Sequence, residues 1–166
     1  MLSILANGLA QNPEIRERNE DYEAFKQALM EICEEISRNI AKDGEGATKL
    51  LTCKVTSAKD TETAKAIAKS VVTSSLFKAA MFGRDANWGR ILCAIGYAEG
   101  DFDIRKVDVT LGSKAGRMQV CEDGAGCGFD EEVALNILSE SEIDILIDMK
   151  QGNAQATAWG LSLIHI

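Results

Sequence analysis

Histidine is almost absent from this chain of 166 residues, in which the only one is His165, second from the end. One imidazole at that position leaves none for a serine–histidine–aspartate triad, or for a histidine-ligated zinc ion, in the rest of the chain. Base catalysis would therefore depend on a carboxylate, a lysine or a terminal amine.

A surplus of positive charge and a long apolar run are also missing. The chain has 18 Lys and Arg against 26 Asp and Glu, for a net charge of −8, and its basic residues are scattered. Phosphate recognition needs a basic face, so we expect no nucleic-acid partner. No apolar run reaches the ~20 residues that span a bilayer, so we expect no membrane-spanning segment. The apolar start lacks a basic segment, so we expect no secretory signal.

The five cysteines form no recognisable framework. Their number is odd and their spacing is irregular, which is typical of a reduced, cytoplasmic chain. Cys121 and Cys127 lack the CxxC spacing and have no histidine nearby, so we expect no metal site. Cys33 and Cys53 fall on apolar positions of a predicted helix and strand.

The hydrophobic pattern predicts alternating strands and helices. Apolar residues at three- and four-residue steps predict a helix from Asn19, which ends at Asp43-Gly44. Strict alternation predicts strands at 49–57 and 142–149. The other predicted elements are a strand at 2–6, helices that begin near Asp60 or Thr61 and near Asp130, a helix at 88–98 buried all round, a hairpin of 104–111 with 117–122, and a last strand at 154–160.

This order of elements predicts one domain with a layered α/β architecture and a mixed sheet, because strands come in antiparallel pairs with helices between them. We find no internal repeat and no low-complexity segment.

Glu45, in the stretch KDGEGATKL, lies between two glycines. GEGATK is superficially similar to a Walker A loop, but Lys49 follows Thr48 rather than glycine, and Leu50 replaces the magnesium-binding hydroxyl. The loop also runs from helix to strand, the reverse of a phosphate loop. Two interpretations stay open: a solvated turn residue, or a carboxylate that holds a substrate ammonium or amide N–H.

A second glycine-rich stretch, EDGAGCGFDEE, contains Gly124, Gly126 and Gly128. The third glycine is one position early for a dinucleotide fingerprint, and three carboxylates in the following helical turn would repel a pyrophosphate. We interpret the stretch as a flexible connector before an acid-capped helix.

The stretch FGRDANWGR at 82–90 is unusually dense in Gly, Asp, Asn, Trp and Arg. The simplest interpretation is a helix start capped by Asn87 or Asp85, with Trp88 in the core. The functional interpretation is a network of Asp85, Asn87 and Arg90 that fixes the shape of a loop beside a site.

Taken in order, DGEGATK at 43–49, SSLFKAAMFGRDANWGR at 74–90 and ILCAIGYA at 91–98 resemble one family closely. This is the bifunctional glutamate N-acetyltransferase / ornithine acetyltransferase family of arginine biosynthesis. The stretches ILANGLA, IDILIDM and GNAQATAWG fit as well, so the resemblance runs from about Ser3 to Gly160.

The resemblance implies a layered α-β-β-α sandwich with a mixed, largely antiparallel sheet, of the self-cleaving acetyltransferase type and truncated here. It implies a precursor that cleaves itself before a threonine, which carries acetyl from N-acetylornithine to glutamate as an acyl-enzyme. An α chain would supply the oxyanion hole within an assembly of α and β chains. Some members also accept acetyl-CoA, and no other cofactor is implied.

Among the family's substrate-binding positions, the resemblance places one here, Glu45 of the EGATK motif. The nucleophilic threonine belongs to an NMATML-like stretch that this chain lacks, so Thr48 is not assigned that role. The family's polar ending is replaced by LSLIHI. We therefore expect 1–160 to be an internal piece of the β chain, 161–166 to be a non-native tail, and the chain alone to be inactive.

Two alternatives remain. The chain could be a piece of a related self-cleaving, aminopeptidase-like hydrolase. It could also be a non-catalytic, acidic α/β binding module in which Glu45 only shapes a turn.

Overall fold

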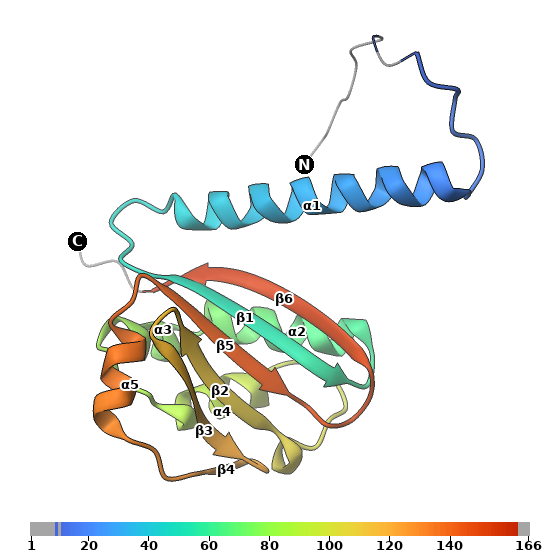
Figure 1. The fold of residues 1–166 in the computed structure, drawn as a ribbon. Helices are drawn as coiled ribbons and strands as arrows, with labels where there is room; N and C mark the ends of the chain where they lie inside the picture. The colour runs from blue at the N-terminus through green and yellow to red at the C-terminus, as the bar shows by residue number, and fades with distance from the viewer. Residues whose placement is uncertain (1–8, 10, 163–166) are drawn as a thin grey trace. The chain divides into compact units, whose positions relative to one another are not determined.

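A computed structural model of the protein describes Leu9 and residues 11–162 (Figure 1). The chain divides into two units, Met1–Ile36 and Ser37–Ile166. The strand predicted at 2–6 lies outside the described residues. No helix in the described part of the chain is long and apolar enough to cross a bilayer.

Helix α1, Glu20–Lys42, begins where the sequence predicts. Asn19 caps it, because its side-chain oxygen accepts a hydrogen bond from the backbone N–H of Tyr22 at 3.0 Å. Acidic residues in the first turn and Lys42 in the last turn complement the helix dipole. The predicted apolar stripe is present, but no residue of α1 is buried by the described chain.

The second unit is built on one mixed sheet with the strand order β4-β3-β2-β5-β1-β6. Among the described strands, β1 and β5 pair in parallel and all other pairs are antiparallel, which confirms the predicted mixed, largely antiparallel sheet. The strands are β1 (Leu50–Ala58), β2 (Asp108–Ser113), β3 (Gly116–Glu122), β4 (Ala125–Gly126), β5 (Glu142–Asp148) and β6 (Ala154–Leu161).

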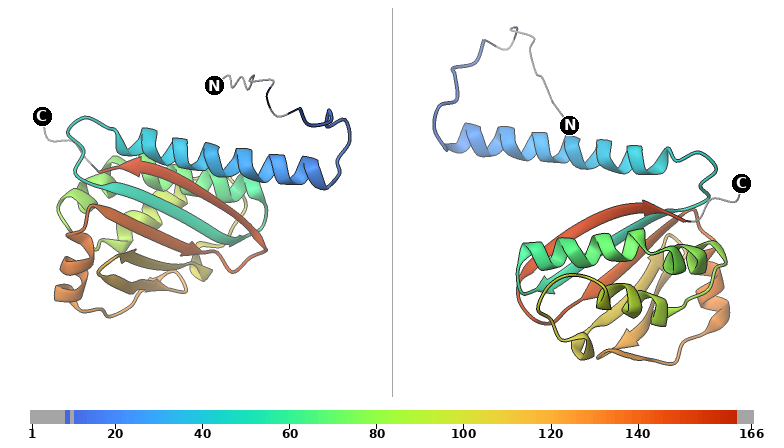
Figure 2. Two further views of the ribbon diagram at one scale, coloured as in Figure 1. Left: turned by 45° about the horizontal axis from the view of Figure 1, so that its top comes forward. Right: turned by 180° about the vertical axis from the view of Figure 1, so that it is seen from behind.

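Three helices cover one face of this sheet (Figure 2): α2 (Thr61–Thr73), α3 (Ser75–Phe82) and α4 (Trp88–Gly96). Helix α5 (Glu131–Leu138) packs beside β2 and β3, and the short 3-10 helix η1 (Ile104–Lys106) leads into β2.

Helix α3 is separate from α2, a division that the hydrophobic pattern did not reveal. Ser74 makes the break: its N–H donates to the carbonyl of Val71, and its hydroxyl accepts from the N–H of Phe77. One residue thus ends one helix and caps the next.

The core lies between the sheet and these helices. The alternation predicted for β1 and β5 is observed, with every second side chain facing α2, α3 and α4. Those side chains are Leu51, Cys53, Val55, Ile143, Ile145 and Ile147, each at most 1% exposed.

The opposite face of the sheet carries Thr52, Lys54 and Thr56, which are half-buried or exposed. No helix that lies wholly within the second unit covers this face (Figure 1). A hollow of about 520 Å³ lies on it, lined by these side chains together with others such as Thr110 and Leu146.

Helix α4 is buried on one side only, so the prediction of a helix buried all round was wrong. Ile91, Ala94 and Ile95 are buried, whereas Cys93 is exposed and Tyr97 is 82% exposed. The reason is that α4 packs against α2, α3 and η1 and forms part of the outer layer.

Candidate functional site

Glu45 lies in the turn that joins α1 to β1. Ala47 donates its N–H to the carbonyl of Gly44 at 3.0 Å, and Gly46 has φ +73°. A positive φ at the third position is typical of a type II turn, which favours glycine there. Glu45 is exposed at the second position, and its carboxylate has no hydrogen bond or ion pair with a described residue. It is therefore available to a ligand.

The two glycines beside Glu45 serve different purposes. Gly46 supplies the positive φ of the turn. Gly44 permits a close approach instead, because a Cβ there would overlap the side chain of Leu161 in β6. The turn that presents Glu45 is thus fixed both by its backbone and by packing against the sheet.

An ion-pair cluster holds the chain just before this turn. Glu142, the first residue of β5, accepts from Nη2 of Arg38 at 2.5 Å and from Nζ of Lys42 at 3.0 Å. The ammonium of Lys42 and the guanidinium of Arg38 hold the pKa of Glu142 below its usual range, against the opposing effect of burial. The last turns of α1 are in this way tied to the sheet.

We expect Glu142→Gln to destabilise the chain modestly and in a pH-dependent way. The side chain of Glu142 is 42% exposed, so the loss at neutral pH should be below about 1 kcal/mol. A carboxyl with a lowered pKa stabilises the fold above its usual pKa, and this contribution is lost as the pH falls through the lowered value. Urea midpoints should therefore differ at neutral pH and converge once the pH falls below the lowered pKa of Glu142. A difference that persists in acid would contradict this origin.

Lys49 lies four residues after Glu45 and is 7% exposed. Its Nζ donates to the carbonyl of Leu138, the last residue of α5, at 2.5 Å. Burial lowers its pKa, the nearby charge of Arg84 lowers it further, and Glu140 opposes both. The strand predicted at 49–57 begins with Lys49 and gives this residue no further role. The alternation of the strand could have predicted the burial of Lys49, because Lys49 shares the register of Leu51 and Cys53 and therefore belongs to the buried face.

The end of β6 meets the same segment. Leu161 pairs with Leu50 in the sheet. Ser162 is 1% exposed, donates its N–H to the carbonyl of Lys49 at 3.1 Å, and places its hydroxyl 3.2 Å from that of Thr48. Residues 163–166 lie outside the described part of the chain, so the non-native tail at 161–166 stays a prediction.

The FGRDANWGR stretch forms a capped loop between α3 and α4. Asn87 is the cap: its Oδ1 accepts from the N–H of Arg90 at 3.2 Å, and its Nδ2 donates to Asp85 at 3.1 Å. Arg90 donates from Nη1 to the carbonyl of Leu76 at 2.8 Å, which ties α4 to α3. Trp88 packs against the core, as predicted.

The loop and the Glu45 turn belong to the same end of the second unit. Figure 2 shows α3 and α5 at the end of the sheet where β1 begins and β6 finishes. Arg84, at the start of the loop, acts on Lys49 there. The hydrogen bonds of Asp85, Asn87 and Arg90 that the structure shows remain within the loop and α3, so their site-shaping role stays a prediction.

Residues 122–126 of the second glycine-rich stretch form a tight hairpin, so the prediction of a flexible connector was wrong there. Asp123 and Gly124 have φ +47° and +69°, and they join the paired residues Glu122 and Ala125. Two positive φ values are typical of a two-residue type I′ turn, for which Asp-Gly is a strong signal. A Cβ on Gly126 would overlap the ring of Trp88. Gly124 therefore serves the turn and Gly126 serves packing. The acid-capped helix predicted after this stretch is confirmed, because Asp130 caps α5.

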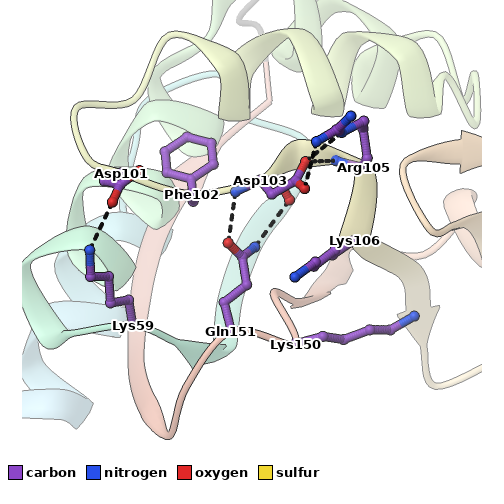
Figure 3. A pocket seen from close by; sticks show the side chains of 8 residues that line it. All are labelled: Lys59, Asp101, Phe102, Asp103, Arg105, Lys106, Lys150 and Gln151. Atoms are coloured by element: carbon purple, nitrogen blue, oxygen red, sulfur yellow. Dashed lines mark hydrogen bonds and ion pairs between the residues drawn. The ribbon is translucent and has the colours of Figure 1, made fainter.

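A larger hollow of about 700 Å³ lies at the far end of β1 (Figure 3). Nine residues of strand, about 30 Å, separate it from the Glu45 turn. Its lining cations are largely neutralised by carboxylates: Lys59 by Asp101 and Arg105 by Asp103. Figure 3 also shows two hydrogen bonds between Gln151 and the backbone of Asp103: Oε1 of Gln151 accepts from the N–H, and Nε2 donates to the carbonyl. The loops around this hollow are therefore held together by hydrogen bonds and ion pairs, and the hollow has no strong excess of charge of either sign.

Comparisons with known proteins agree on one family. A model described as the ArgJ family matches residues 1–165. The chain is 48% identical over 162 residues to the arginine biosynthesis bifunctional protein ArgJ of Caldanaerobacter subterraneus, covering 98% of this chain and 40% of that protein. It is 44% identical over 163 residues to the ArgJ protein of Thermotoga neapolitana, covering 98% and 41%.

A solved structure gives the same result. The crystal structure of the arginine biosynthesis bifunctional protein ArgJ from Bacillus halodurans is similar with a TM-score of 0.88 and 38% identity, over 95% of this chain and 73% of that one. The chain spans about 40% of the length of the curated relatives that it matches.

Proposed function

Because this chain belongs to the ArgJ family, we propose that it is part of a longer protein that transfers an acetyl group from N-acetylornithine to glutamate in arginine biosynthesis. The observation that carries the proposal is the family match over residues 1–165, which includes both the DGEGATK and the FGRDANWGR motif. The match favours this function over a related hydrolase and over a binding module.

Glu45 is the residue of this chain that we propose to contact substrate. Its carboxylate stands on a tightly held turn and has no described partner. Both substrates carry nitrogen donors, and a carboxylate accepts from an ammonium or amide N–H through a strong, charge-assisted hydrogen bond. Glu45 would thereby orient the substrate toward a nucleophile that lies outside this chain.

The chemistry that we propose suits a chain without a usable histidine. A threonine elsewhere in the precursor would take the acetyl group as an acyl-enzyme, with its own terminal amine as base. We propose no cofactor, and acetyl-CoA as an alternative acetyl donor. The role of this chain is to bind and orient substrate.

The uncovered sheet face supports our proposal for partners. No helix lying wholly in the second unit covers this broad surface, which combines apolar and hydroxyl side chains such as Leu146 and Thr110 with charged ones such as Lys54, Arg117 and Asp144. In an α-β-β-α sandwich such a face packs against a second sheet. We propose that the remainder of the β chain and the α chain supply that layer. The odd number and irregular spacing of the five cysteines support a cytoplasmic location.

The test is acetyl transfer measured with purified proteins. The full-length protein should convert N-acetylornithine and glutamate to ornithine and N-acetylglutamate, and the 166-residue chain alone should not. A full-length protein that folds and cleaves itself but transfers no acetyl group would contradict the proposed function. Turnover by the chain alone would contradict the placement of the nucleophile outside it.

A further inference from the structure

Lys49 is the one charged side chain among the described residues that is buried. Lysine is rarely buried unless it is paired with an opposite charge. Here Nζ donates to a neutral carbonyl, that of Leu138, while Glu140, the carboxylate whose charge raises the pKa of Lys49, is already paired with Lys114 at 2.9 Å.

The charge of Lys49 is poorly explained by stability alone. Its lowered pKa means that the charged form is less favourable in the folded chain than in the unfolded one. An apolar side chain of similar length often stabilises such a position as well as a buried ion does, or better. What the lysine provides and an apolar side chain would not is the hydrogen bond to the Leu138 carbonyl and the geometry that this bond imposes.

That hydrogen bond fixes the segment on which Glu45 stands. The carbonyl of Leu138 is one of the unsatisfied carbonyls at the C-terminal end of α5, where a cation is favourable. Lys49 thus joins α5 to the start of β1. The backbone carbonyl of Lys49 also accepts a hydrogen bond from the N–H of Ser162, the residue after β6. On the other side, Gly44 packs against Leu161. The turn between these two anchors has little freedom to move.

We infer that Lys49 is a positioning residue for Glu45: its buried ammonium, bound to the end of α5, holds the Gly44–Ala47 turn where the Glu45 carboxylate can meet a substrate nitrogen. This inference rests on the proposed function. Lys49 touches no substrate itself. It acts through the backbone, as groups behind a binding residue do when they fix its orientation.

The test is Lys49→Met in the full-length protein, with Lys65→Met as a matched control. Lys65 is exposed on α2 and, among the residues that the structure describes, pairs with Glu62 alone, three residues away. Lys49→Met should raise KM for N-acetylornithine about tenfold or more, because small displacements of a binding group are costly. The kcat, the extent of self-cleavage and Tm should change little, and Lys65→Met should resemble the wild type.

A second readout does not depend on activity. In the 166-residue chain labelled with nitrogen-15, Lys49→Met should shift the backbone amide resonances of Glu45 and Gly46, and Lys65→Met should not. If Lys49→Met does not fold, Lys49→Gln is measured in the same way.

The outcomes separate the two proposals. An unchanged KM with unchanged turn resonances would overturn the positioning role, whether or not Tm falls. If the wild-type full-length protein transfers no acetyl group, the proposed function fails first and the positioning role falls with it.

Discussion

Replacing Glu45 by Gln in the full-length protein is expected to lower kcat/KM for acetyl transfer by about 30-fold to 150-fold. The change keeps the size of the side chain but removes its charge, and a hydrogen bond to a charged group contributes roughly 2–3 kcal/mol. The loss should appear mainly in KM, because Glu45 holds the substrate rather than reacting with it. Steady-state kinetics with N-acetylornithine as the varied substrate measure it.

The control for this prediction is Glu99→Gln. Glu99 is an exposed acid in the loop after α4, and its replacement should leave the kinetics unchanged. Self-cleavage should be complete in both variants, since Glu45 has no part in it. Kinetics of Glu45→Gln equal to those of the wild type would remove Glu45 from the substrate site.

Replacing Gly124 by Ala is expected to destabilise the chain by about 2–4 kcal/mol. Gly124 has φ +69°, which costs an alanine about 1–2 kcal/mol. A Cβ there would also crowd the backbone of Ile104 and Arg105, and backbone cannot rotate away as a side chain can. Urea denaturation of the 166-residue chain, followed by circular dichroism, should show the loss.

Gly128 offers a matched control four residues further along. A Cβ added there would meet nothing within 4 Å, and no positive φ is required. Gly128→Ala should therefore stay within about 0.5 kcal/mol of the wild type. Equal stability of both variants would show that the Asp123-Gly124 hairpin is not packed as described.

The sequence predicted the elements well where periodicity was strict. Strict alternation predicted the strand β5, whose Ile143, Ile145 and Ile147 are buried in the core, and the three- and four-residue steps predicted the helix α1 from Asn19, which caps it. It did less well where one residue decides the structure. Ser74 divides α2 from α3 through two hydrogen bonds, which no hydrophobic period can reveal.

The candidate site was predictable only in part. The position of Glu45 in a glycine-flanked turn was evident from the sequence, and the family resemblance selected it. The separate purposes of Gly44 and Gly46 were not evident from the sequence, because Gly44 contacts Leu161, which lies more than a hundred residues later in the chain. The burial of Lys49 could have been read from the register of β1. The hydrogen-bond partner of Lys49, the carbonyl of Leu138, could not have been predicted from the sequence, since that contact depends on the tertiary fold.

The most direct test is the crystal structure of the full-length protein with N-acetylornithine bound. We predict that a carboxylate oxygen of Glu45 lies within about 3.2 Å of a substrate nitrogen, with the Gly44–Ala47 turn and the bond from Lys49 to Leu138 unchanged. A substrate bound elsewhere, with Glu45 surrounded only by solvent, would contradict the account.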